Sequence, residues 1–155
     1  MGLVETFRAL EELELAMARL YELLAESHAT DTEAARLFLR LAIDEHSHAR
    51  QVALQRRLVL QLPQPPADIP LYQAETLRLH QEVVTAACAA GKIPLEKAVI
   101  LAIYFEASAA EHHIGVPLAD VDPEISRVVS ALGRGDNDHL ERLRSFAAGR
   151  GISIP

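Results

Sequence analysis

The feature that most limits how this chain can fold is a spacing of apolar residues, alternately three and four positions apart, in four long stretches. Such a stripe is typical of an α-helix that packs along its length against other helices. The stretches run over about residues 3–27, 31–61, 94–113 and 123–148. Ala, Leu, Glu and Arg, which are strong helix formers, are abundant. The sequence therefore predicts an all-α chain.

Residues that cap or break helices mark the ends of these stretches. They include the pair Thr30 and Glu33, which form a capping-box pattern, and Pro94, Asp122 and Pro123 at predicted helix starts. Four prolines in 63–70 predict a linker, and 72–90 predicts a shorter helix that ends at Gly91. We expect one domain over residues 1–155, a four-helix bundle of two antiparallel hairpins joined by a long crossover with one short extra helix.

Composition excludes several classes of protein. A formal net charge of -7 argues against nucleic acid or an anionic membrane as the main partner. The single cysteine, Cys88, rules out an intrachain disulfide, a cysteine-only zinc site and a Cys₄ iron site. The first ten residues contain Glu5 and Arg8 and no long apolar run, so we expect no signal peptide, no membrane span and a cytoplasmic protein.

Each of the four apolar stripes contains one carboxylate near its middle, and two stripes also carry a histidine three positions later. These residues are Glu14, Glu45, His48, Glu106, Asp136 and His139. Burying one ionised carboxylate costs several kcal/mol, and four that face one core would also repel each other. Two divalent cations would supply the missing positive charge. The sequence therefore predicts a buried site for two metal ions.

The spacing of these residues suits metal binding. Residues three positions apart lie on one helix face, so Glu45 can share a site with His48, as Asp136 can with His139. Oxygen and imidazole ligands suit iron or manganese better than magnesium, and the lack of thiolates disfavours structural zinc. For any single one of these residues, a purely structural role explains its position as well as metal binding does. Six such residues, in phase and repeated at nearly one spacing, together favour a metal site.

Three neighbours of the predicted ligands have alternative roles. Tyr21 lies seven positions after Glu14, and His113 lies seven after Glu106. We take both as candidate catalytic residues beside the metals, although a buried tyrosine is also common in cores and His113 is equally suited to be an extra ligand. Asp44 either orients a ligand histidine or makes a surface ion pair.

Two glycines interrupt the last predicted helix directly before Asp136. Gly133 and Gly135 each cost roughly 1 kcal/mol relative to alanine inside a helix. We expect a local distortion there, such as a π-bulge, that moves the backbone toward the metals so that the short Asp136 side chain can reach them.

Together these residues resemble the ferritin-like di-iron carboxylate superfamily, most closely the rubrerythrins. The pieces that match are Glu14 with Tyr21, Glu45-His46-Ser47-His48, the run Pro94-Leu95-Glu96-Lys97-Ala98 leading to Glu106, and Asp136-Asn137-Asp138-His139. The resemblance implies a ferritin-like four-helix bundle. It also implies that Glu14 and Glu106 are terminal ligands, that Glu45 and Asp136 bridge the metals, and that His48 and His139 each bind one metal.

The resemblance further implies a di-iron oxidoreductase that reacts with hydrogen peroxide or dioxygen. Its cofactors would be two iron ions, or manganese in one or both positions. A separate electron-donor protein would serve it because the rubredoxin domain of full rubrerythrins is absent, and it would form a homodimer or larger homo-oligomer. The alternatives are an iron-binding or storage protein with ferroxidase activity, and a non-catalytic metal sensor or scaffold. Two residues depart from the family, since Asp136 replaces a glutamate and His113 stands where tyrosine is frequent.

Overall fold

The computed structural model of this chain describes residues 3–61, 63, 70–114 and 123–155, which form helices and the turns between them without any strand. The helices are α1 (Leu3–Ser27), α2 (Thr32–Leu60), α3 (Pro70–Ala89), α4 (Leu95–Ile114) and α5 (Pro123–Gly149), with a 3₁₀ turn, η1 (Ala90–Lys92), between α3 and α4. The predicted all-α class is confirmed. The predicted helix ends agree to within two residues, which is the usual uncertainty of a helix end.

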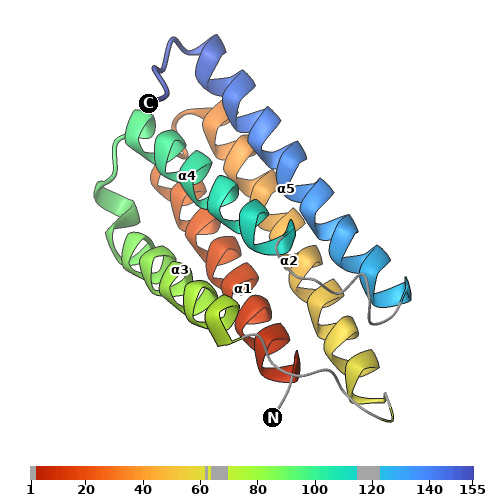
Figure 1. The fold of residues 1–155 in the computed structure, drawn as a ribbon. Coiled ribbons are helices and arrows are strands. Elements are labelled where there is room, and N and C mark those ends of the chain that lie inside the picture. Colours follow the sequence, from red (N-terminus) through yellow and green to blue (C-terminus); the bar gives the residue numbers. More distant parts are fainter. Residues whose placement is uncertain (1–2, 62, 64–69, 115–122) are drawn as a thin grey trace.

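The helices pack side by side (Figure 1). α1 and α2 lie antiparallel, as the ion pairs Glu11–Arg56 (2.9 Å) and Glu22–His46 (2.9 Å) show at two points along them. α5 packs against α4 and α2. α3 lies on the side of the molecule opposite α5, where it packs against α1 and also contacts α4. Buried apolar side chains from α1 to α5 form one continuous core.

Three details of the helices differ from the prediction. The N-cap of α2 is Asp31, whose side chain accepts a hydrogen bond from Ala34 N at 3.1 Å, so the predicted capping box at Thr30 is wrong by one residue. Pro94 lies just outside α4, where its carbonyl accepts a hydrogen bond from the Ala98 backbone. The extra helix is not short, because α3 has 20 residues, the same number as α4.

The length of α3 follows from its contact with α1. Thr76, Leu79 and Val83 are fully buried and occupy one face of the helix at a helical spacing. This buried stripe spans about two turns, and packing of such a stripe is what stabilises a helix in water. The four prolines in 63–70 therefore do not limit the length of α3.

The predicted distortion of the last helix is absent. α5 is a continuous α-helix from Pro123 to Gly149, and the stretch 132–137 has the same helical assignment as the rest. The prediction of a π-bulge was therefore wrong. None of the described helices is long and apolar enough to cross a membrane.

Candidate metal centre

Five of the six predicted metal ligands lie together in the core. They are Glu14 on α1, Glu45 and His48 on α2, Glu106 on α4 and His139 on α5, with relative exposures of 1%, 1%, 7%, 0% and 2%. Each occupies the inward stripe of its helix, where an apolar residue would otherwise pack. The side chains of Asp136, the sixth predicted ligand, and of His113, a candidate catalytic residue, fall outside what the structure describes.

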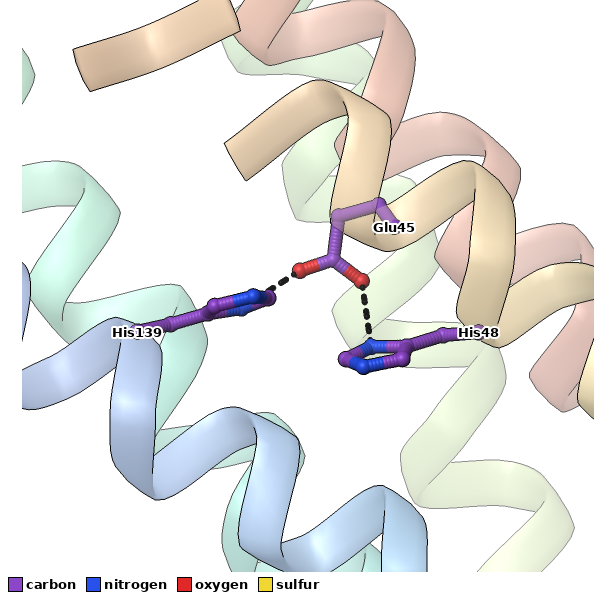
Figure 2. A group of neighbouring side chains, drawn as sticks. All are labelled: Glu45, His48 and His139. Atoms are coloured by element: carbon purple, nitrogen blue, oxygen red, sulfur yellow. Dashed lines mark hydrogen bonds and ion pairs between the residues drawn. The ribbon is translucent and has the colours of Figure 1, made fainter. Parts of the chain in front are cut away.

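Glu45 lies at the centre of this cluster. Figure 2 shows its carboxylate between the two histidines, with one oxygen directed at each ring. Oε2 of Glu45 is 3.2 Å from Nδ1 of His48, and Oε1 is 3.0 Å from Nδ1 of His139. The two imidazole rings face each other, with centroids 5.2 Å apart and an interplanar angle of 26°. One carboxylate therefore connects the two halves of the cluster.

The other two carboxylates approach the same ring nitrogens. Oε2 of Glu14 is 3.6 Å from Nδ1 of His48, and Oε2 of Glu106 is 3.1 Å from Nδ1 of His139. Each Nδ1 carries at most one hydrogen, so four carboxylate oxygens converge on two N–H groups. Three carboxylates thus place negative charge around two neighbouring imidazoles, which is the condition that a bound cation would relieve.

The hydroxyl of Tyr21 contacts this cluster directly. Tyr21 is fully buried on α1, its ring stacks on Phe38 with centroids 6.3 Å apart, and its hydroxyl donates a 2.6 Å hydrogen bond to Oε1 of Glu106. This bond joins α1 to α4 and fixes one oxygen of the Glu106 carboxylate. The other oxygen, Oε2, is the one that faces His139.

Asp44 lies at the outer edge of His139. Its Oδ2 is 3.5 Å from His139 Nε2, 2.7 Å from Nη1 of Arg142 and 3.6 Å from Nε of Arg40. The aspartate therefore makes both contacts that the sequence had left as alternatives, the ion pair and the contact with a ligand histidine. Burial alone would raise the pKa of Asp44, but the hydrogen bond from Arg142 and the nearby positive charges lower it overall.

The charges in the cluster shift the pKa of its members strongly. Burial, together with the charges of Glu106 and Glu14, raises the pKa of Glu45 well above its usual range. Burial would lower the pKa of both histidines, but their carboxylate partners outweigh it and raise the pKa of His48 to about 10 and of His139 to about 11. Without a metal the cluster therefore retains protons, which is the expected response of carboxylates gathered in a core.

The donor set fits a metal ion. Three residues each offer one ligand atom, and these atoms all lie within 4.8 Å of one another: Glu45, His48 and His139. All three residues are buried. Carboxylate and imidazole ligands without a thiolate suit first-row divalent metals such as iron, manganese or zinc. These three side chains can therefore hold a metal ion.

A small polar pocket connects the cluster with the surface between α2 and α5. It has a volume of about 210 Å³. Its lining residues are Asp44, Ser47, His48, Gln51, Gly135, Asp138, His139 and Arg142. Because both histidines belong to this lining, the pocket can bring small polar molecules or ions to the cluster, but it is too small for a large substrate.

Comparison of the chain with protein families, curated proteins and solved structures found no match. Fold and site together define a class: an all-helical protein with a buried glutamate and histidine cluster that can bind metal.

Proposed function

We propose that this chain is a di-iron carboxylate protein, an oxidoreductase that reduces hydrogen peroxide or dioxygen. The observation that supports this most directly is the convergence of Glu14, Glu45 and Glu106 with two imidazoles in one buried cluster. Such a gathering of acids in a core is costly unless cations are bound among them. The similarity of the ligand pattern to rubrerythrins suggests the type of reaction.

In this proposal α1, α2, α4 and α5 form a ferritin-like four-helix bundle, and α3 belongs to the crossover between its two hairpins. The packing of α1 on α2 and of α4 on α5 is consistent with two such hairpins. The candidate ligands of the cluster come from all four of these helices, and the described part of α3 contributes none. This distribution is that of di-metal sites built in the core of helical bundles.

The proposal gives each ligand a place relative to two metal ions. Glu45 would bridge them, since its two oxygens face different histidines. Glu14 would bind the metal next to His48, and Glu106 the metal next to His139. Asp136 would be the second bridge, by its position three residues before His139. Two adjacent irons, when bound, supply two electrons together to a small oxidant.

The surrounding residues would hold the ligands and control access. Tyr21 fixes one oxygen of Glu106, so this carboxylate keeps its orientation when its charge environment changes. Asp44 stands behind His139 and can accept its outer N–H, which makes the imidazole a better ligand. The polar pocket would admit peroxide or dioxygen and exclude bulky reductants.

Regeneration of the centre requires an external source of electrons. Reduction of one peroxide consumes two electrons, and the metals must regain them before the next turnover. We therefore propose a separate electron-donor protein as partner, together with assembly into a homodimer or larger homo-oligomer.

The proposal is tested by anaerobic reconstitution with ferrous iron, removal of unbound metal and elemental analysis. We expect about two irons per chain, and loss of most of them in Glu45→Ala. The matched control, Glu96→Ala, removes an exposed glutamate on α4 and should retain both. Addition of peroxide should then oxidise the bound iron in a rapid phase seen by stopped-flow absorbance.

Other outcomes of the same experiment would replace the proposal. Accumulation of many irons per chain after repeated additions of ferrous iron and oxygen would identify a storage protein. A chain that stays folded and binds no iron would leave a scaffold. Bound metal that does not react with peroxide or oxygen would leave a sensor.

A further inference from the structure

Gly135 lies in α5 directly against the imidazole of His48. A Cβ atom built on Gly135 would be 2.5 Å from Nε2 and 2.8 Å from Cε1 of that ring. Both distances are below 3.0 Å, a separation that real Cβ atoms essentially never show. Even alanine, the smallest side chain, would therefore overlap the ring unless His48 or α5 moved.

The backbone of Gly135 does not itself require glycine. α5 is regular through this position, and among the described residues only Gly151 has a positive φ. A glycine inside a regular helix lowers its stability relative to alanine. What glycine provides here is the space that the missing side chain leaves for His48.

We propose that Gly135 is a positioning residue that allows His48 to reach the metal centre. The inference rests on the proposed function, because it concerns the occupancy of that centre. His48 is held between two sides, with Glu45 and Glu14 at 3.2 Å and 3.6 Å from Nδ1, and the α5 backbone at Gly135 against Nε2. A methyl group at 135 pushes the ring out of this slot. Since metal–ligand distances tolerate only about ±0.2 Å, a displaced His48 cannot coordinate.

His139, the second histidine of the cluster, has an aspartate next to its Nε2, where His48 has a glycine. Gly135 directly precedes Asp136 in the sequence, as Asp44 directly precedes Glu45. Asp44 stands 3.5 Å from Nε2 of His139, whereas Gly135 stands against Nε2 of His48. The two halves of the cluster are therefore not equivalent. A side chain at 135 should therefore weaken metal binding next to His48 and leave metal binding next to His139 unchanged.

The experiment is a titration of metal-free protein with Co²⁺, followed by visible absorption and equilibrium dialysis. We expect about two Co²⁺ per chain in the wild type and about one in Gly135→Ala. The control, Gly149→Ala, is in the same helix but has nothing within 4 Å of its new Cβ, so it should bind two.

A second pair of variants separates displacement of His48 from a general effect on folding. His48→Ala should also bind about one Co²⁺, and adding Gly135→Ala to it should cause no further loss. In that background the melting temperature of the metal-free protein should rise, because alanine favours the helix and no longer meets the imidazole.

Four results are decisive. Two tightly bound Co²⁺ in Gly135→Ala, as in the wild type, would overturn the positioning role while leaving the metal centre intact. Additive losses of Co²⁺ in the double variant would overturn it as well. A wild type that binds no Co²⁺ would refute the proposed function itself. Loss of Co²⁺ in Gly149→Ala equal to that in Gly135→Ala would show a general effect of helix substitution and would also refute the inference.

Discussion

The hydroxyl of Tyr21 donates a 2.6 Å hydrogen bond to Oε1 of Glu106, across 85 positions of sequence and from one helix to another. Both side chains are fully buried. The bond therefore connects α1 to α4 at the level of the candidate metal centre, and it leaves the second oxygen of Glu106 directed at His139.

Replacing Tyr21 with Phe tests this connection. The ring and its packing on Phe38 remain, but one oxygen of a buried carboxylate loses a donor, which costs about 1–3 kcal/mol. Each kcal/mol corresponds to roughly 2–4 °C in melting temperature for a chain of this size. We expect a lower melting temperature with metal bound and a slower reaction with peroxide. Unchanged values of both would contradict a role for this hydrogen bond.

Replacing Glu45 with Gln tests the electrostatic cost of the cluster. The environment raises the pKa of Glu45, so the folded state disfavours its ionised form and should favour a neutral amide of the same shape. In chelator at pH 8, the melting temperature of Glu45→Gln should exceed that of the wild type. With Co²⁺ present the order should reverse, because the variant loses the central ligand. A less stable metal-free variant would show that Glu45 is stabilised by its surroundings instead.

The pH dependence of the metal-free protein follows from the two histidines. Their folded-state pKa values, about 10 for His48 and about 11 for His139, lie above the ordinary value of 6.5. Their contribution to stability is therefore complete below about pH 6.5 and is lost as the pH rises through 10 and 11. The raised pKa of Glu45 acts in the same direction. Melting temperatures in chelator should fall from pH 6.5 to pH 10.

The same series with Co²⁺ bound provides the control. The metal replaces the protons of the cluster, so the loss of stability over this range should be smaller than in chelator. A metal-free melting temperature that rises between pH 6.5 and 10 would contradict the raised pKa values.

Replacing Asp44 with Asn tests the support of His139. The amide is nearly isosteric but loses the charge that faces Nε2 of His139 and Nη1 of Arg142. Loss of a carboxylate behind a ligand histidine typically lowers metal affinity about 10–100-fold. Competition with a coloured chelator should show such a loss for one of two Co²⁺ ions. Asp138→Asn, an exposed residue of the same pocket, should retain wild-type affinity; an equal loss in both would indicate a general electrostatic effect.

The sequence was sufficient to predict the helices because their apolar stripes are long and their ends carry strong signals. Pro123 is the first residue of α5, and Gly91 follows α3 within η1. The error at Asp31 arose because Thr30 and Asp31 are both good caps, and local pattern does not decide between them. In the structure, Asp31 also accepts two hydrogen bonds from Arg150, a contact across 119 positions.

The candidate ligands could be placed on the inward faces of their helices because helical periodicity fixes the direction of side chains. Contacts between helices could not be derived in this way. The glycine at 135 was visible as an exception inside a helix, but periodicity gave no means to see that His48 lies against it. A backbone distortion was therefore expected where the structure has a regular helix and a close side-chain contact.

The most direct test of the account is a crystal structure of the iron-reconstituted protein with anomalous data collected at the iron edge. We expect two anomalous peaks beside Glu45, one next to Nδ1 of His48 and one next to Nδ1 of His139. Absence of any peak in this cluster, in a protein that keeps the fold described above, would contradict a di-iron centre.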